Sequence, residues 1–281
     1  MTNTQKRFLL FAVALPVLAC LILISWANHL AINLVVLLIT VIGTNEMARM
    51  LRTAGFSVPV KALTAASAIM PVMTYLIVIG VLDEVAVPLY FLLAGLLVLI
   101  FPIFTMGEVN FKGLLEAAAG SLLSLFYPGY FLTYIIRFSG YESASIILII
   151  FMLMVYLNDS NAWFMGVFFG RKSRRGIFTV SPNKSLIGFG GGIFASLVVT
   201  ITSWFLFPHI MQGPLWSVVL LGFVAGMTTI LGDLIESGIK RSAGVKDSGS
   251  IVMGRGGLLD SIDSLLLTAP IFYYFLHFTS L

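Results

Sequence analysis

The sequence predicts an all-α, polytopic integral membrane protein, because its composition is strongly apolar and its hydrophobic runs are long. Of 281 residues, 59% are hydrophobic and only 10% are charged, whereas soluble globular domains carry about 25% charged residues. So few charges cannot cover the surface of one or two soluble domains. The net charge of +4 fits inside loops that lie near anionic lipid, and we expect no nucleic-acid partner.

Apolar runs that are long enough to cross about 30 Å of hydrocarbon predict nine transmembrane helices. These runs fall at residues 8–27, 30–48, 62–82, 85–105, 113–136, 144–168, 186–207, 215–235 and 258–279. The first run follows Lys6 and Arg7, which is the layout of a signal peptide, but it reaches spanning length and we expect it to stay uncleaved. The single cysteine, Cys20, cannot form an intramolecular disulfide.

The basic residues predict how the spans are oriented, because Lys and Arg are retained on the cytoplasmic side. With the N-terminus inside, all but one of the sixteen Lys and Arg residues fall in inside segments, and the exception is Arg137. The run of Arg171, Lys172, Arg174 and Arg175 is typical of such an inside loop. We therefore expect a cytoplasmic N-terminus and an outside C-terminus.

The character of the chain changes at about residue 155. Residues 1–154 have the composition of a mostly lipid-facing scaffold, whereas the spans within residues 155–281 contain carboxylates, amides and glycine clusters. Ionisable groups inside a membrane usually face a cavity and mark function. We expect one continuous membrane domain with an N-terminal transmembrane scaffold, 1–154, and a C-terminal catalytic transmembrane region, 155–281.

Asn158 and Asp159 are polar residues inside the sixth apolar run. A carboxylate at that depth costs at least a few kcal/mol unless it is paired, solvated or bound to a metal. One interpretation is a hydrogen-bond cluster that holds the helices together, and the other is the wall of a substrate site. The nearness of the next motif favours the site wall.

The loop after this span has the features of an anion site. Ser181 followed by Pro182 resembles an N-cap and a first helical position, so we expect a helix to begin there. The free backbone N–H groups of that helix start, with Lys184 nearby, would suit a phosphate. Gly188 and Gly191 follow as the chain re-enters the membrane, and these glycines serve either the site or close helix packing.

The densest polar stretch runs from residue 233 to residue 263. Residues three, four and seven apart share a helix face, which predicts two polar faces: Asp233, Glu236, Ser237 and Lys240 on one helix, and Asp260, Asp263 and Ser264 on the next. A solvated loop is the ordinary alternative, but both faces belong to membrane spans. Carboxylate oxygens on two helices, without a Cys or His cluster, favour Mg²⁺ or a similar ion.

The three histidines, His29, His209 and His277, lie at the outside ends of spans, and we interpret them as interfacial residues. Carboxylates, a divalent cation, basic side chains and glycine-rich turns together indicate phosphoryl or nucleotidyl transfer. Such a reaction requires no nucleophile from the protein.

The C-terminal half resembles the phosphatidate cytidylyltransferases, which are also called CDP-diacylglycerol synthases. The resemblance is carried by Ser237-Gly238-Ile239-Lys240-Arg241, then Lys246-Asp247-Ser248-Gly249, then Gly254-Arg255-Gly256-Gly257-Leu258-Leu259-Asp260-Ser261-Ile262-Asp263-Ser264. Upstream it continues through Asn158-Asp159, Gly170-Arg171, Ser181-Pro182-Asn183-Lys184-Ser185, Gly188 and Gly191-Gly192. It covers about residues 155–275, and the sequence departs from the family pattern mainly at Met253, Arg255 and Ser261.

The resemblance implies transfer of a cytidylyl group from CTP to phosphatidic acid, giving CDP-diacylglycerol and pyrophosphate, at a site on the cytoplasmic side of the cell membrane. It implies Mg²⁺ as cofactor, and the sequence leaves open whether a second cation shares the site and whether the chain forms a homodimer. The implied metal ligands are Asp233, Asp247, Asp260 and Asp263. The implied catalytic contacts to phosphates, with Asp247, are Lys240, Arg241, Lys246 and Arg255. The implied substrate-binding residues are Asn158, Asp159, Ser181, Lys184, Gly188, Gly191, Ser237, Gly256 and Gly257.

Two other functions fit part of the pattern. A CTP-dependent lipid-alcohol kinase would share the nucleotide and the metal, but it would need a base for a hydroxyl group. An ion-coupled membrane transporter would use the buried carboxylates to bind its ion. A transporter also predicts charges deep in several spans and repeats between the two halves, and neither feature is apparent in the sequence.

Overall fold

The fold is all-helical, which confirms the predicted fold class. The computed structural model describes residues 3–105, 111–170, 173, 175–176, 178–252 and 254–279. Within this part of the chain the only β pairing consists of two isolated bridges. The helices are α1 (Asn3–Leu23), α2 (Trp26–Thr53), α3 (Val60–Val78), α4 (Ala86–Thr105), α5 (Phe111–Ser124), η1 (Leu125–Tyr130), α6 (Thr133–Arg137), η2 (Phe138–Gly140), α7 (Ala144–Phe168), α8 (Leu186–Leu206), α9 (Leu215–Ser242) and α10 (Leu259–Thr279).

Among the described residues, eight helices are long and apolar enough to cross a membrane. They correspond to the last eight predicted runs, and the largest difference is at the end of α9, which continues to Ser242. The first predicted span lies mostly in α1, whose apolar stretch Ala12–Leu23 is shorter. The crossing of the membrane by α1 therefore stays a prediction, and so does the orientation of the termini.

The fifth span, Gly113–Gly140, is a helix with an irregular middle. Pro128 has no N–H to donate and lies in the π-helical segment η1. Beside it, the Phe131 N–H donates to the Phe126 carbonyl, five residues back, at 3.3 Å. A proline and a π-bulge are ordinary causes of a change in helix direction.

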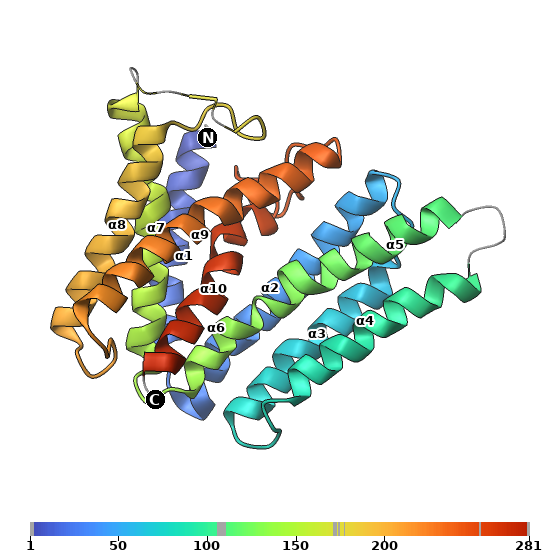
Figure 1. Ribbon diagram of the computed structural model, residues 1–281, viewed down its shortest axis with the longest axis horizontal. Helices are drawn as coiled ribbons and strands as arrows, with labels where there is room; N and C mark the ends of the chain where they lie inside the picture. The colour runs from blue at the N-terminus through green and yellow to red at the C-terminus, as the bar shows by residue number, and fades with distance from the viewer. Residues whose placement is uncertain are drawn as a thin grey trace. The chain divides into compact units, whose positions relative to one another are not determined.

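The chain separates into two compact units. The first unit comprises residues 1–141 and 242–261, and the second comprises residues 142–241 and 262–281. Within the first unit, α2, α3, α4 and α5 run side by side (Figure 1). Within the second, α7 packs along α8. The loop after α9 and the first turn of α10 therefore belong with the N-terminal helices, whereas the predicted functional division at residue 155 stays a prediction.

Glycines allow the helices of the second unit to approach closely. A Cβ atom placed on Gly191 of α8 would lie 2.5 Å from Met165 Cγ of α7. A Cβ atom on Gly232 of α9 would lie 2.5 Å from the carbonyl oxygen of Asp263 in α10. Small residues at such positions let transmembrane backbones come together, which is a main source of association between helices in lipid.

We expect Gly232→Ala to destabilise the protein, because the added methyl group would meet backbone atoms that cannot move aside cheaply. The matched control is Gly190→Ala in α8, where an added Cβ has nothing within 4 Å. Overpacking of this kind costs about 1–3 kcal/mol, so the Gly232 variant should melt several degrees below the control in detergent. Equal melting temperatures for the two variants would contradict the close approach of α9 and α10.

Candidate functional site

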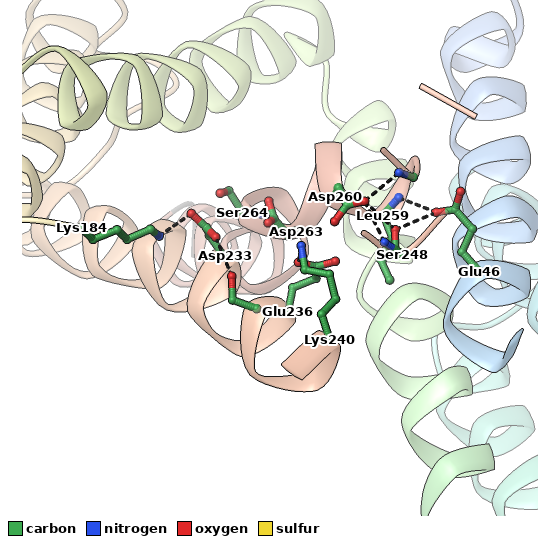
Figure 2. A network of polar contacts seen from close by, with 12 residues as sticks. Glu46, Lys184, Asp233, Glu236, Lys240, Ser248, Leu259, Asp260, Asp263 and Ser264 are labelled. Carbon is green, nitrogen blue, oxygen red and sulfur yellow. Dashed lines mark hydrogen bonds and ion pairs between the residues drawn. The ribbon is translucent and has the colours of Figure 1, made fainter. Parts of the chain in front are cut away.

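The polar face of α9 in the second unit carries two ion pairs. Lys184, from the loop before α8, pairs with Asp233 (Figure 2), and the Ser237 hydroxyl donates to the other oxygen of Asp233 at 3.4 Å. One turn further along, Lys240 pairs with Glu236, whose side chain is fully buried. The helical spacing therefore brings Ser237 beside Asp233 and Lys240 beside Glu236 as predicted, whereas a functional role for these residues stays a prediction.

Asp263 of α10 belongs to the same unit and is 8% exposed. Its Oδ1 accepts a hydrogen bond from the Ser264 N–H at 2.6 Å, and it makes no ion pair within the described residues. The charged groups that act on its carboxylate are Asp233, Asp159 and Lys240. The Ser264 hydroxyl also donates to Asp159 of α7 at 3.4 Å, so this neighbourhood draws on three helices.

Acidic side chains outnumber basic ones in this part of the second unit: Asp159, Asp233, Glu236 and Asp263 against Lys184 and Lys240. A surplus of carboxylates in apolar surroundings is costly unless a cation or hydrogen bonds offset it. Hard oxygen donors suit Mg²⁺ or a similar ion. Within the described residues, however, no three His, Cys, Asp or Glu side chains gather closely enough to hold an ion. The chemistry of the donors suits a cation, although the side chains as placed do not close around one.

Asn158 joins three helices of the second unit. Its side chain is fully buried in α7, and its Nδ2 donates to Ser196 Oγ of α8 at 2.9 Å and to the Gly226 carbonyl of α9 at 3.3 Å. A Cβ atom on Gly192 would lie 2.6 Å from Asn158 Oδ1, so the amide fills the space that this glycine leaves. The contacts favour the helix-joining interpretation, and substrate binding by Asn158 stays a prediction.

The predicted helix start at Ser181 is wrong. Helix α8 begins at Leu186, and its N-cap is Ser185, whose Oγ accepts from the Gly188 N–H at 3.1 Å. Ser181 and Pro182 lie in a preceding turn. Both serines satisfy the N-cap preference, but only Ser185 stands directly before the apolar run. The anion site that we predicted at a helix beginning with Pro182 is therefore not formed.

Gly188 and Gly191 lie where α8 meets α7. A Cβ atom on Gly188 would come within 2.8 Å of the Ala162 carbonyl oxygen. The Gly191 carbonyl accepts a hydrogen bond from Asn161 Nδ2 at 2.7 Å. These contacts support the packing role that the sequence left open, whereas a role in nucleotide binding stays a prediction.

The loop between α9 and α10, in the first unit, carries several predicted site residues. Lys246 and Asp247 are exposed, and Arg255 is half-buried in a tight turn. This turn is closed because Val252 and Gly256 exchange backbone hydrogen bonds of 2.8 and 3.1 Å. Gly256 has φ of 114°, a conformation that glycine adopts without strain.

Glu46 of α2 reaches this loop (Figure 2), and it was not among the predicted site residues. It is 5% exposed. Its Oε1 accepts from the Leu258 N–H at 3.0 Å, and its Oε2 accepts from the Leu259 N–H at 2.8 Å and from the Ser248 hydroxyl at 3.2 Å. The signal available in the sequence was an isolated acidic residue near the end of an apolar run, which is unusual inside a membrane.

Asp260, in the first turn of α10, also accepts hydrogen bonds from this loop. Its Oδ2 accepts from the Gly257 N–H at 2.7 Å, from the Ser248 N–H at 2.9 Å and from the Ser248 hydroxyl at 3.0 Å. A Cβ atom on Gly257 would lie 2.6 Å from Glu46 Oε2. The absence of a side chain on Gly257 therefore leaves room for Glu46 beside the backbone of the loop. A role for Asp260 or Gly257 in metal or substrate binding stays a prediction.

Few or no contacts are described for the remaining residues that the sequence singled out. Arg241 is exposed at the end of α9. The Ser261 hydroxyl is buried and has no hydrogen-bond partner among the described residues. Four residues that the sequence singled out lie outside the described part of the chain: Arg171, Lys172, Arg174 and Met253.

We expect Lys240→Met to lower the stability of the folded protein, because it removes the ammonium group that faces the buried carboxylate of Glu236. Breaking one side of a buried pair costs about 3–5 kcal/mol. Thermal melting in detergent would measure the loss, with Arg241→Met at the neighbouring exposed position as the control. The double variant Glu236→Gln with Lys240→Met should recover much of the loss, and no recovery would argue against the pair.

Comparisons with known proteins bear on the chain from its first helix to its last. The model of the cytidylyltransferase family matches residues 5–279. A Synechocystis phosphatidate cytidylyltransferase is 30% identical over 91% of this chain and 90% of its own length. A Staphylococcus saprophyticus phosphatidate cytidylyltransferase is 36% identical over 55% of this chain and 57% of its own length. An uncharacterised Escherichia coli protein, YnbB, is 38% identical over 47% of this chain and 43% of its own length.

Proposed function

The chain belongs to the cytidylyltransferase family, and from this premise we propose that it transfers a cytidylyl group from CTP to phosphatidic acid. The products are CDP-diacylglycerol and pyrophosphate. The names of the Synechocystis and Staphylococcus relatives supply the acceptor lipid. The chain is an integral membrane enzyme in this proposal, and it acts in the synthesis of phospholipids.

The observation that carries the proposal is the acidic surplus on α7, α9 and α10 in the second unit, with Lys184 and Lys240 beside it. Nucleotidyl transfer brings together several phosphate groups and the cation that accompanies them, so the site must handle both signs of charge. Ionisable groups inside a lipid-facing helix bundle are energetically costly, so their presence here indicates a functional site.

In the proposed reaction, a phosphate oxygen of phosphatidic acid attacks the α-phosphorus of CTP. A new P–O bond forms, the bond between the α- and β-phosphates breaks, and pyrophosphate leaves with the electron pair. The attacking phosphate is already anionic, so no base has to remove a proton. The enzyme's tasks are to neutralise the repulsion between the phosphates and to align them.

The basic side chains would perform most of the neutralisation. We assign phosphate contacts to Lys240, Arg241, Lys246 and Arg255, and a supporting contact to Lys184. A bound divalent cation, Mg²⁺ in this proposal, would supply further positive charge to the phosphates. Its candidate ligands are Asp233, Asp247, Asp260 and Asp263.

The first experiment uses purified protein in detergent with labelled CTP, phosphatidic acid and Mg²⁺, and it follows labelled lipid product. We expect wild-type protein to form CDP-diacylglycerol and to lose this activity when the cation is chelated. Asp263→Asn and Asp247→Ala should each lower the rate by about 100-fold or more, because each removes charge that orders the reacting groups. Asp83→Asn, at an exposed position in another loop, should leave the rate unchanged.

The same assay separates the alternatives. A lipid-alcohol kinase would release CDP and phosphorylate a long-chain alcohol, and a transporter would show no nucleotide chemistry. If wild-type protein forms no CDP-diacylglycerol with any divalent cation, the proposal is wrong.

The positive-inside pattern supports a site that faces the cytoplasm, and thiol labelling can test this orientation. In a Cys20→Ser background, we expect Ser57→Cys to be protected from an impermeant thiol reagent in intact cells and Gln212→Cys to react with it. Both positions are exposed, one between α2 and α3 and the other between α8 and α9. The reverse labelling pattern would overturn the predicted orientation.

A further inference from the structure

We propose that Glu46 is a positioning residue for the transfer reaction. It holds the loop between α9 and α10, together with the first turn of α10, in the conformation that presents Asp247 and Arg255 to the substrates. The consequence for catalysis rests on the proposed function, whereas the effect on the loop can be measured without any activity. Through this loop, Glu46 gives the N-terminal helices an indirect part in the reaction.

The first support is the way in which Glu46 caps α10. The Leu258 and Leu259 N–H groups stand at the start of that helix, where backbone donors have no partner within the helix. Leu258 has no side chain that could accept a hydrogen bond, so Glu46 accepts both, at 3.0 and 2.8 Å, from 212 and 213 positions away in the sequence. A carboxylate is favoured at a helix N-terminus, and its hydrogen bonds are charge-assisted.

The second support is that Glu46 and Asp260 hold the loop together. The Ser248 hydroxyl lies 3.2 Å from Glu46 Oε2 and 3.0 Å from Asp260 Oδ2. Its single proton is shared between the two carboxylates, and the Ser248 and Gly257 N–H groups also donate to Asp260 Oδ2. Both ends of the loop are therefore tied into one network, and such networks act as a unit.

The third support is steric. A Cβ atom on Gly249 would lie 2.8 Å from Glu46 Cδ, and a Cβ atom on Gly257 would lie 2.6 Å from Glu46 Oε2. The loop backbone can close around the carboxylate only because both positions are glycine. Glu46 and the loop thus fit each other in shape as well as in charge.

Asp247 and Arg255, the loop residues proposed to contact the substrates or the cation, lie next to these contacts in the chain. Asp247 directly precedes Ser248, and a Cβ atom on Gly256 would lie 2.9 Å from the Cβ atom of Asp247. Arg255 lies in the turn that Val252 and Gly256 close. Loss of a supporting partner typically lowers metal affinity or activity about 10- to 100-fold, because the contacting groups lose their orientation.

The experiment compares wild-type protein with Glu46→Ala and Glu46→Gln, and it uses Asn33→Ala as a matched destabilising control. Asn33 is also a buried polar residue of α2, and it hydrogen-bonds to Ser139 at 3.0 Å, away from the loop. Hydrogen exchange of peptides within residues 245–260 measures the order of the loop. The kcat, the KM for CTP and the concentration of Mg²⁺ at half activity are measured well below the melting temperature.

We expect Glu46→Ala to speed exchange in the loop by about tenfold or more and to lower kcat by about 10- to 100-fold with a higher Mg²⁺ requirement. Glu46→Gln should have a smaller effect, since it keeps one acceptor oxygen. Asn33→Ala should lower the melting temperature but leave loop exchange and kinetic constants near those of the wild type.

A double variant tests whether Glu46 and Ser248 act together. Residues in one network show non-additive effects, so Glu46→Gln with Ser248→Ala should lose less activity than the product of the two single losses. Independent effects would contradict the shared network.

Two outcomes overturn the proposal: loop exchange and kinetic constants unchanged in Glu46→Ala, or changed equally in Asn33→Ala. A different result separates it from the proposed function. If wild-type protein makes no CDP-diacylglycerol but Glu46→Ala alone loosens the loop, the proposed reaction fails while the hold of Glu46 on the loop stands.

Discussion

A charged group inside a bilayer must find its partners within the chain, because no water is there to solvate it. The second unit meets this requirement with ion pairs between Lys184 and Asp233 and between Lys240 and Glu236. Asp263 has only a backbone donor and no ion pair among the described residues. The remaining negative charge is the physical reason to expect a cation there. The lysines that stand beside these carboxylates carry the opposite charge, which is what the proposed binding of phosphates requires.

The first unit meets the same requirement with backbone N–H groups. Glu46 and Asp260 each accept two of them, and the Ser248 hydroxyl adds a shared donor. Backbone donors cannot leave without local unfolding of the loop or of the start of α10, whereas a lysine can move to another partner by rotating its side chain. The two solutions therefore differ in rigidity. Backbone capping suits a fixed support, and a lysine pair suits a group that exchanges partners, as the proposed contacts with phosphates require.

Eight of the nine predicted spans correspond to helices in the described residues, with ends that differ by a few residues, because hydropathy and length dominate the choice of helix in lipid. The shared face of Asp233, Glu236 and Lys240 also followed from helical spacing alone. The start of α8 could not be decided in the same way, since Ser181 and Ser185 are both acceptable caps. Glu46 was missed for a different reason: its partners lie more than 200 positions away, and no local pattern encodes such a contact. The carboxylate that supports the loop was therefore hidden in a stretch that we interpreted as scaffold.

The glycines show why a pattern of residue types does not reveal a role. The sequence predicts substrate binding by Gly188, Gly191 and Gly257, with packing as the alternative for the first two. In the structure, α7 lies where side chains on Gly188 and Gly191 would be, and Glu46 and Ser248 lie where a side chain on Gly257 would be. A glycine that yields its space to a carboxylate still serves the reaction if that carboxylate orders the loop. In that case the same glycine contributes to both packing and function. Only measurements of stability and of reaction rate, made separately, can distinguish the two contributions.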